Sequence, residues 1–193
     1  AGIPLYIKKS KSVSAIINYG LAGDRLNKFF SDRPSARHLP MMNRNIARSK
    51  FAIVKDAEVS DILVPETTIE LTRSMKPSEW IEKRFNSIGG IGIKIAVGRG
   101  KIAGKYYQKF VSNRVYELRV HAFKWVPQEE WVIQKRIGDK DEIAWNYKNG
   151  GTFQTVHNKN HRVFKEALEV SEKILEMRNM GFGAVDLIVD EDR

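Results

Sequence analysis

Apolar and polar residues alternate along residues 116–123, which is the pattern of a strand with one buried face. One face would carry Leu118, Val120 and Ala122, and the other would carry Glu117, Arg119, His121 and Phe123. Residues 131–136 have a similar pattern and are expected to pair with this strand in an antiparallel sheet. The apolar run at 183–190 contains one acid in its interior, Asp186, and predicts a buried strand.

Apolar residues at helical spacing predict a long amphipathic helix ahead of that last strand, ending near Gly181. Its apolar positions are Val163, Ala167, Val170, Ile174 and Met177. Three further strands are expected at 80–85, 93–97 and 106–111. The first two would form a hairpin around the glycine-rich turn 86–92. Residues 69–75 predict a helix that ends before Pro77, and residues 145–155 predict a loop.

The first 67 residues mix strand and helix patterns, as a small α/β lobe would. Strands are expected at 14–20 and at 62–64, where Pro65 closes the run. Helices are expected at 24–30 and 43–50, and the second leads into the short apolar run 51–54.

Composition narrows the class of protein. The chain has 193 residues, of which 42% are hydrophobic, so it can form one compact unit or two small lobes around a cleft. The absence of cysteine excludes disulfides and cysteine-ligated metals, and fits the cytoplasm of a host cell or the interior of a virion. No apolar run approaches the ~20 residues of a membrane helix, and the N-terminus lacks a signal-peptide pattern.

The charge is strongly basic, with 33 Lys and Arg against 23 Asp and Glu. Such a balance favours a polyanionic partner, which could be nucleic acid, the phosphates of a nucleotide or an acidic peptide, although it also serves solubility. The basic residues are scattered and no nucleic-acid-binding motif accompanies them. A nucleic-acid partner is therefore an alternative rather than the leading interpretation.

Four segments could carry chemistry, and one of them is the polar, glycine-containing segment 145–153, which could be a substrate loop. The glycines of turn 87–92 would let backbone N–H groups approach phosphate oxygens, but the same turn could be a plain hairpin connection, and it matches neither a Walker loop nor a dinucleotide fingerprint. Arg119 could bind a phosphate or carboxylate with paired donors, or it could form an ordinary ion pair on a solvated face. Asp186 could ligate Mg²⁺ or be a hydrogen-bonded structural acid.

The order of these segments is more specific than any one of them. The chain carries Glu117-Leu118-Arg119-Val120-His121, then the basic pair Lys135-Arg136, the polar loop 145–151 and finally Phe182-Gly183-Ala184-Val185-Asp186. This series resembles the ATP-grasp proteins. It is most similar to the bacteriophage-encoded branch, whose members show similar Glu-aromatic-Arg-Val-His and Phe-Gly-Ala-Val-Asp segments, and more distantly to the ribosomal-protein glutamate ligases. The resemblance spans residues 80–190 and, loosely, the opening lobe.

The resemblance implies an α+β chain with the ATP-grasp fold, in which two lobes hold a nucleotide. Residues 1–67 would form a preceding α/β lobe, residues 68–111 the small lobe with its glycine-rich flap, and residues 112–193 a large lobe truncated at its C-terminus. The implied activity is an ATP- and Mg²⁺-dependent carboxylate–amine ligase that forms an acyl-phosphate from an unidentified acid before an unidentified amine attacks it.

The resemblance also implies roles for individual residues. Those that would contact the nucleotide are Arg84 or its neighbour Lys83, the flap residues Ser87, Gly89, Gly90 and Gly92, the hinge residues Lys109 and Val111, and Glu117. Those that would act on the γ-phosphate or the acceptor carboxylate are Arg119, Lys135 and Arg136, with Asn146 and Asn149 in the substrate loop. Asp186 would be the first magnesium ligand.

The sequence departs from the family pattern at one point. A second metal-binding motif, Glu-x-Asn, is expected shortly after Asp186, and the sequence reaches Arg193 without it. The chain is then a fragment, lacks its tail, or has an incomplete metal site, because Asp190 and Glu191 stand at the wrong positions to replace the motif. A nucleotide-binding or structural protein without turnover is therefore the first alternative function, and a basic nucleic-acid-associated protein is the second.

Overall fold

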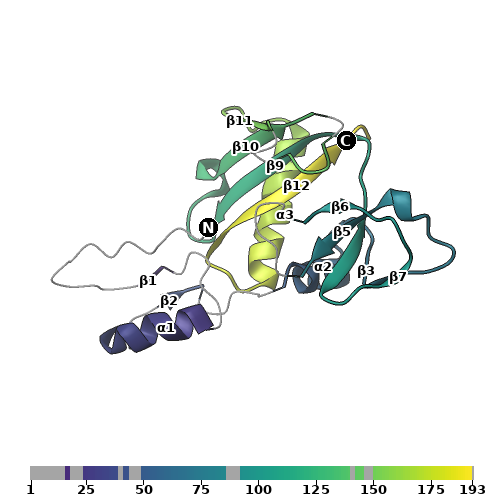
Figure 1. The fold of residues 1–193 in the computed structure, drawn as a ribbon. Coiled ribbons are helices and arrows are strands. Elements are labelled where there is room, and N and C mark those ends of the chain that lie inside the picture. The colour runs from purple at the N-terminus through teal and green to yellow at the C-terminus, as the bar shows by residue number, and fades with distance from the viewer. Residues whose placement is uncertain are drawn as a thin grey trace.

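Two four-stranded antiparallel sheets, each contacted by a helix, form the main body of the protein (Figure 1). The computed structural model describes residues 16–17, 24–38, 41–43, 49–85, 92–139, 142–145 and 150–192. The mixture of helices and antiparallel sheets confirms the expected α+β class.

The larger sheet has the strand order β11-β10-β9-β12. Its strands are β9 (Arg114–Phe123), β10 (Val132–Ile137), β11 (Thr152–Thr155) and β12 (Phe182–Asp190). The predicted antiparallel pairing of the first two is confirmed, and β12 pairs with the other edge of β9. The loop expected at 145–155 contains β11, which pairs with β10 and extends the sheet.

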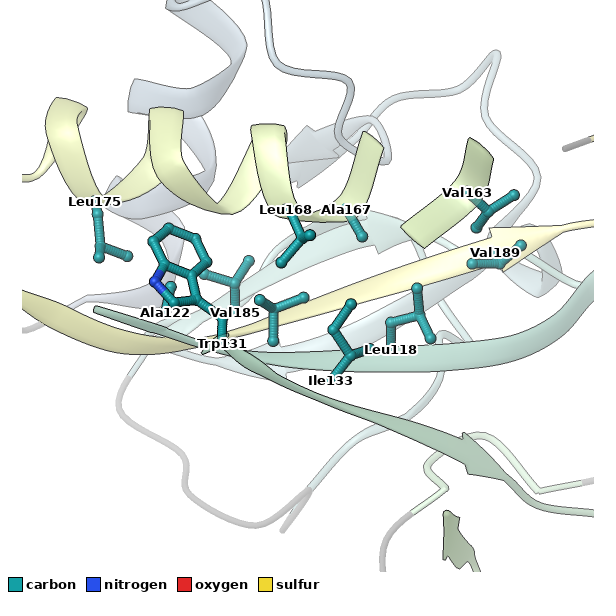
Figure 2. Close-up of a cluster of buried hydrophobic side chains, with 11 residues drawn as sticks. Leu118, Ala122, Trp131, Ile133, Val163, Ala167, Leu168, Leu175, Val185 and Val189 are labelled. Carbon is teal, nitrogen blue, oxygen red and sulfur yellow. The ribbon is translucent and has the colours of Figure 1, made fainter. Parts of the chain in front are cut away.

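Helix α3 (Arg162–Met177) packs on one face of this sheet and forms the main hydrophobic core with it, as Figure 2 shows. His161 caps the start of the helix, because its Nδ1 accepts a hydrogen bond from the Val163 N–H at 3.4 Å. It ends before Asn179, which has a φ of 47°, a left-handed conformation that asparagine tolerates. The predicted amphipathic helix is therefore confirmed. The buried core side chains are Leu118, Val120, Ala122, Trp131, Ile133, Val163, Ala167, Leu168, Leu175, Val185 and Val189.

The smaller sheet has the strand order β3-β8-β5-β6, and a two-stranded ribbon, β4-β7, lies near it. The bounds are β3 (Thr67–Thr68), β4 (Glu70–Leu71), β5 (Trp80–Arg84), β6 (Lys94–Ile95), β7 (Gly100–Lys101) and β8 (Lys105–Lys109). The hairpin predicted at 80–97 is confirmed by the pairing of β5 with β6.

The helix expected at 69–75 is wrong, because Glu70 and Leu71 form the short strand β4 and residues 73–75 form a turn. Leu71 is almost completely buried in a second hydrophobic cluster with Trp80, Ala96 and Tyr107. Pairing to β7 and β8 and burial of one residue in this cluster outweigh the weak helical spacing of a short apolar run.

The N-terminal elements are short. They are β1 (Ile16–Ile17), which pairs in parallel with β2 (Met41–Met42), and the helices α1 (Asp24–Asp32) and α2 (Lys50–Val59). Single 3-10 turns lie at η1 (Pro34–Ala36), η2 (Pro77–Glu79) and η3 (Gln128–Glu130). None of the helices within the described part of the chain combines the length and the apolarity that crossing a membrane requires.

Two predictions for the first lobe need correction. The helix expected at 43–50 falls mostly outside the described residues, and the helix that is described, α2, begins at Lys50 and includes the apolar run 51–54. Residues 62–64 form no strand, although the structure describes them. Helix α2 contacts both α3 and β3, and its Phe51 packs edge-on against Phe85 with ring centroids 5.5 Å apart. It therefore connects the two sheets.

Asn43 fixes the N-terminal segment to the start of β12. Its Nδ2 donates to the Phe182 carbonyl at 2.8 Å, and its Oδ1 accepts from the Gly181 N–H at 2.8 Å. The side chain is buried and the backbone has a φ of 56°, which only glycine, asparagine and aspartate adopt readily. One residue therefore satisfies two backbone groups at the end of the loop after α3.

We predict that Asn43→Ala lowers the free energy of unfolding by about 2–4 kcal/mol, because two buried backbone groups lose their partners and alanine is strained at positive φ. Asn43→Gly removes the same hydrogen bonds without the strain, so it should be less destabilising by about 1 kcal/mol. Urea unfolding of the two variants checks this, and equal stabilities of wild type and Asn43→Ala would contradict it.

Candidate functional site

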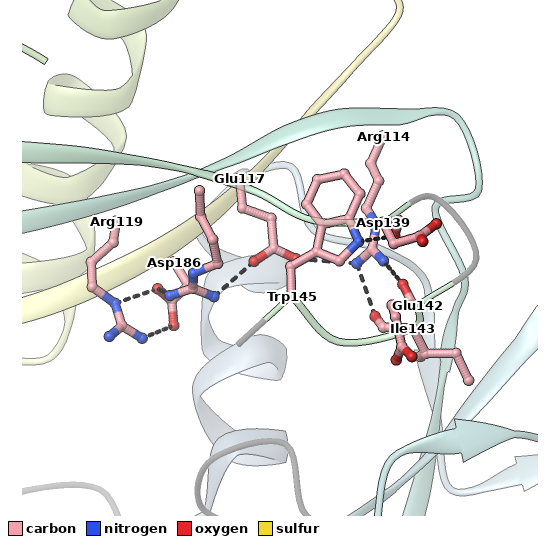
Figure 3. A network of polar contacts seen from close by, with 9 residues as sticks. Arg114, Glu117, Arg119, Asp139, Glu142, Ile143, Trp145 and Asp186 are labelled. Carbon is pink, nitrogen blue, oxygen red and sulfur yellow. Dashed lines mark hydrogen bonds and ion pairs between the residues drawn. The ribbon is translucent and has the colours of Figure 1, made fainter. Parts of the chain in front are cut away.

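Charged side chains gather on the face of the larger sheet that α3 does not cover. Because side chains alternate along a strand, burial of Leu118, Val120 and Ala122 under α3 turns the residues between them to the opposite face. The cross-strand register adds neighbours from β10 and β12 on either side of β9, and Figure 3 shows one of them, Asp186, beside Arg119. The polar residues brought together in this way are Glu117, Arg119 and His121 from β9, Gln134 and Arg136 from β10, and Asp186 from β12.

Asp186 is held by two arginines. Arg119 donates from Nε to Asp186 Oδ1 at 2.7 Å and from Nη2 to Oδ2 at 2.9 Å, in the bidentate geometry that suits guanidinium and carboxylate. Arg136 Nη2 also donates to Oδ1, at 3.3 Å. The Asp186 side chain is 51% exposed, which corrects the expectation of a buried acid. The reason is that β12 is an edge strand with only one face covered by α3.

Glu117 lies between two guanidinium groups, and one of them, Arg136, is shared with Asp186. Arg136 Nη1 donates to its Oε2 at 2.8 Å, and Arg114 Nη1 donates to its Oε1 at 3.2 Å. Burial raises the pKa of Glu117, while Arg136 and Arg114 lower it and Asp186 raises it further. The buried Nε of Arg136 has no hydrogen-bond acceptor among the described residues.

The smaller sheet contributes Lys83 to the same region. Its Nζ donates to Gln108 Oε1 at 2.5 Å. Burial lowers the pKa of Lys83 to about 8, the charge of Lys50 lowers it further, and the carboxylate of Glu117 opposes both effects. Glu117 of the larger sheet is therefore near enough for its negative charge to act on the pKa of Lys83 of the smaller sheet.

Arg84, the residue preferred on sequence, points the other way. Neighbours on a strand project to opposite faces, so Arg84 leaves the face that carries Lys83. It is exposed, and its Nε would lie 3.2 Å from a Cβ placed on Gly92. Gly92 has a φ of 78°, which suits a glycine turn. The structure therefore brings Lys83, not Arg84, toward Glu117.

The expected basic pair Lys135-Arg136 is separated for the same reason. Lys135 pairs across the sheet with Leu118, so it stands on the α3 side, where its Nζ lies 4.0 Å from the centroid of the Tyr116 ring. Arg136 pairs with Glu117 and stands on the polar face. Lys135 is therefore not part of the charged cluster, which is a correction.

The hinge residues are placed between the sheets. The Lys109 N–H donates to the Glu66 carbonyl at 2.8 Å, and the Lys109 side chain is paired with Glu79. A ligand would therefore compete with protein for the Lys109 N–H. Val111 is half-buried in the connection between β8 and β9. The predicted residues Ser87, Gly89, Gly90, Asn146 and Asn149 lie outside the described residues.

Among the described residues, Asp186 is the exposed carboxylate of the polar face. The described residues contain no group of three His, Asp or Glu side chains arranged to hold a metal ion. Asp186 is exposed enough to reach an ion, and Mg²⁺ commonly binds one or two carboxylates together with the phosphate oxygens of a nucleotide. Asp190 stands four residues further along β12, at roughly 13 Å, too far to share an ion with Asp186. The residues present therefore fit a metal ion that is ligated by Asp186 and by the phosphate oxygens of a nucleotide.

Comparison with solved structures places this arrangement in a known fold. No family model matches the sequence, and no curated protein has a significantly similar sequence. Macrocyclase MdnC bound with precursor peptide MdnA, from Microcystis aeruginosa, superposes with a TM-score of 0.53 at 14% identity over 88% of this chain and 59% of that chain. An ATP-grasp superfamily protein from Archaeoglobus fulgidus superposes with a TM-score of 0.56 at 13% identity over 87% and 52% of the two chains.

A third similar structure was solved with a nucleotide. It is a RiPP-associated ATP-grasp ligase from Chryseobacterium gregarium in complex with ADP and a leader and core peptide, with a TM-score of 0.51 at 14% identity over 86% of this chain and 56% of that chain. This chain thus spans between half and three-fifths of the length of these three proteins. Because the sequence identities are this low, the superpositions establish the architecture alone. They show that the chain has the ATP-grasp fold.

Proposed function

We propose that this protein binds ATP on the polar face of its larger sheet and uses it to join a carboxylate to an amine through an acyl-phosphate. The observation that carries the proposal is the gathering of Arg119 and Arg136 on the polar face of an ATP-grasp sheet, with Lys83 of the smaller sheet near Glu117 and with no acceptor among the described residues for the buried Arg136 Nε. We place the lobes at residues 1–67, 68–111 and 112–193.

The charge balance of the cluster favours a phosphate ligand. Arg114, Arg119, Arg136 and Lys83 surround only two carboxylates, Glu117 and Asp186, so positive charge is in excess. Guanidinium groups bind phosphate oxygens with paired hydrogen bonds, as they bind carboxylates. A triphosphate can therefore take the place of Asp186 as the acceptor for Arg119.

Asp186 would then be available to hold Mg²⁺ together with the phosphates. When bound, Mg²⁺ neutralises charge on the oxygens around the transferred phosphoryl group. The side chains supply the remaining stabilisation. Arg119 and Arg136 bind the oxygens on which negative charge is concentrated, and Lys83 approaches them from the opposite sheet.

The ligation step follows from the electrophile that ATP creates. A carboxylate resists attack by an amine, whereas its phosphorylated form loses inorganic phosphate when the amine nitrogen attacks the acyl carbon. The two sheets would hold the acid and the nucleotide together and exclude the water that would hydrolyse the acyl-phosphate. Two of the similar proteins were solved with peptides, so a peptide is the first acid or amine substrate to test.

A nucleotide-binding protein without turnover is the second candidate. It is favoured by the engagement of both Asp186 oxygens with Arg119, and by the absence, within the described ranges, of three acidic or histidine side chains grouped to hold a metal ion. Such a protein would bind ATP and release no ADP.

We predict that Arg119→Ala weakens ATP binding, measured by calorimetry with Mg²⁺, by tenfold to a hundredfold, because a charge-assisted contact to phosphate contributes about 1.5–3 kcal/mol. Arg162→Ala is the matched control. Arg162 also pairs with a carboxylate, Glu166, at 2.7 Å, but its side chain is 88% exposed on α3. This variant should bind ATP within twofold of wild type.

The same samples distinguish the two candidates. Formation of ADP that requires both an acid and an amine, from pools that include peptides, supports the ligase. Tight ATP binding without ADP from any pool supports the binding protein. Failure of wild type to bind ATP at millimolar concentration, or equal binding by Arg119→Ala, rules out both.

We predict that ATP affinity falls as the pH rises above about 8, by up to tenfold per pH unit. The pKa of Lys83 is about 8 in the free protein, so above that pH the amine is neutral and must take up a proton to bind phosphate. Calorimetry in buffers of different ionisation enthalpy should detect this proton uptake. Lys83→Met should weaken binding and remove this pH dependence, whereas Arg84→Met, altered on the opposite face, should do neither.

Lys83→Met should also stabilise the protein at pH 7, by roughly 1–3 kcal/mol, because the folded state no longer charges a buried amine. The sign follows from the pKa. A folded pKa of about 8, below the ordinary 10.5, makes wild type gain stability as the pH rises from about 8 to 10.5. Urea unfolding at pH 7 and 10 measures both, and an unstabilised Lys83→Met at pH 7 would contradict the assignment.

A further inference from the structure

Arg114 contacts three parts of the molecule at the junction between the two sheets. It is the first residue of β9, and its side chain is only 5% exposed. It donates from Nη1 to Glu117 Oε1 at 3.2 Å and to the Ile143 carbonyl at 2.9 Å, and from Nη2 to the Glu142 carbonyl. Its guanidinium carbon lies 5.7 Å from the centroid of the Phe110 ring.

A register change in the sheet brings Arg114 to this position. Val189 pairs with Tyr116 while Asp190 pairs with Arg114, so Val115 is skipped. In a regular strand Arg114 would share the face of Leu118, in the core under α3. The irregularity turns it instead to the face of Glu117.

Trp145 completes the arrangement. Its ring centroid lies 4.0 Å from the guanidinium carbon of Arg114, and its Nε1 donates to the Asp139 carbonyl at 2.6 Å, as Figure 3 shows. The ring also lies against Gly138, where an added Cβ would be 2.4 Å from two ring carbons. The buried Trp145 therefore needs both the glycine and the arginine.

The contacts of Arg114 cannot be made by another residue type. Arg114 binds two carbonyls from the β10–β11 connection and one carboxylate oxygen, and it stacks on one indole face. These contacts need a planar group with several donors in fixed directions, which lysine lacks. Phe110 is in turn tied to the smaller sheet, since its N–H donates to the Glu79 carbonyl at 2.8 Å. Arg114 thus contacts the connection between the sheets, Glu117 and the β10–β11 connection simultaneously.

We infer that Arg114 is a positioning residue for the nucleotide site: by stacking on Trp145 and binding Glu117, it holds the β10–β11 connection and the Glu117 carboxylate in the arrangement that receives the nucleotide, without touching the nucleotide itself. The inference rests on the proposed function. Arg114 acts through Arg136, because Arg114 fixes one Glu117 oxygen while Arg136 binds the other, and the Arg136 Nε has no acceptor among the described residues.

The test combines a local probe with a binding constant. The chain has four tryptophans, so 5-fluorotryptophan labelling should give four ¹⁹F resonances, and Trp145→Phe identifies the one from Trp145. Arg114→Lys should shift or broaden that resonance and raise the Kd for ATP by about tenfold or more, because small displacements of positioning groups are costly. Gly138→Ala, which displaces the indole and leaves Arg114 intact, should do the same.

Arg178→Lys is the matched control. Arg178 is also shielded, at 19% side-chain exposure, and pairs with Asp56 on α2, away from Glu117. Arg178→Lys should leave the Trp145 resonance unchanged and the Kd for ATP within twofold of wild type, although this variant also loses a guanidinium contact. A general loss of folding would affect all four resonances and both arginine variants.

The outcomes separate this inference from the proposed function. Wild type that binds ATP, together with Arg114→Lys and Gly138→Ala that bind it equally well, overturns the inference and leaves the proposed function standing. A changed Trp145 resonance with unchanged Kd also overturns it, because Arg114 would then order the connection without serving the nucleotide. Absence of ATP binding by wild type overturns the proposed function, and the inference with it.

Discussion

The site depends on guanidinium groups that share two carboxylates on one face of a sheet. Glu117 accepts from Arg114 and Arg136, and Asp186 accepts from Arg119 and Arg136. Burying such charges is costly unless they are paired and hydrogen-bonded, and the shared carboxylates provide that pairing. This pairing stabilises the cluster in the absence of a ligand. Because the cations outnumber the acids, the cluster still attracts an anion.

The sequence predicted which side chains share a face in strands that have one buried face and one polar face. In β9, burial of every second residue under α3 leaves only one possible orientation, so the shared face of Glu117 and Arg119 is confirmed. In β5 the pattern is ambiguous, because Trp80 and Ile81 are both buried on opposite faces. Nothing in the order of residues then distinguishes Lys83 from Arg84 as the one that approaches Glu117, and only the pairing of the sheets decides.

Arg114 could not be recognised from the sequence for a different reason. Its position depends on a skipped residue in the β9–β12 pairing, and on an indole from a connection that the sequence predicts only as a loop. Irregular pairing reverses the side-chain alternation on which sequence interpretation depends. The glycine at 138 was the one local signal, since a glycine at a strand end can mark a close approach by a large side chain.

The net charge of +10 has a different origin from the charge of the site. Residues 1–111 contain 20 basic and 9 acidic residues, whereas residues 112–193 contain 13 basic and 14 acidic residues. The larger sheet and α3 are therefore close to neutral, and their positive groups act because geometry concentrates them on one face. The basic excess lies in residues 1–111, of which only Lys83 is proposed to act at the nucleotide site, so the net charge of the chain is not an argument for nucleotide binding on the larger sheet. Composition and site chemistry thus have to be argued separately in this protein.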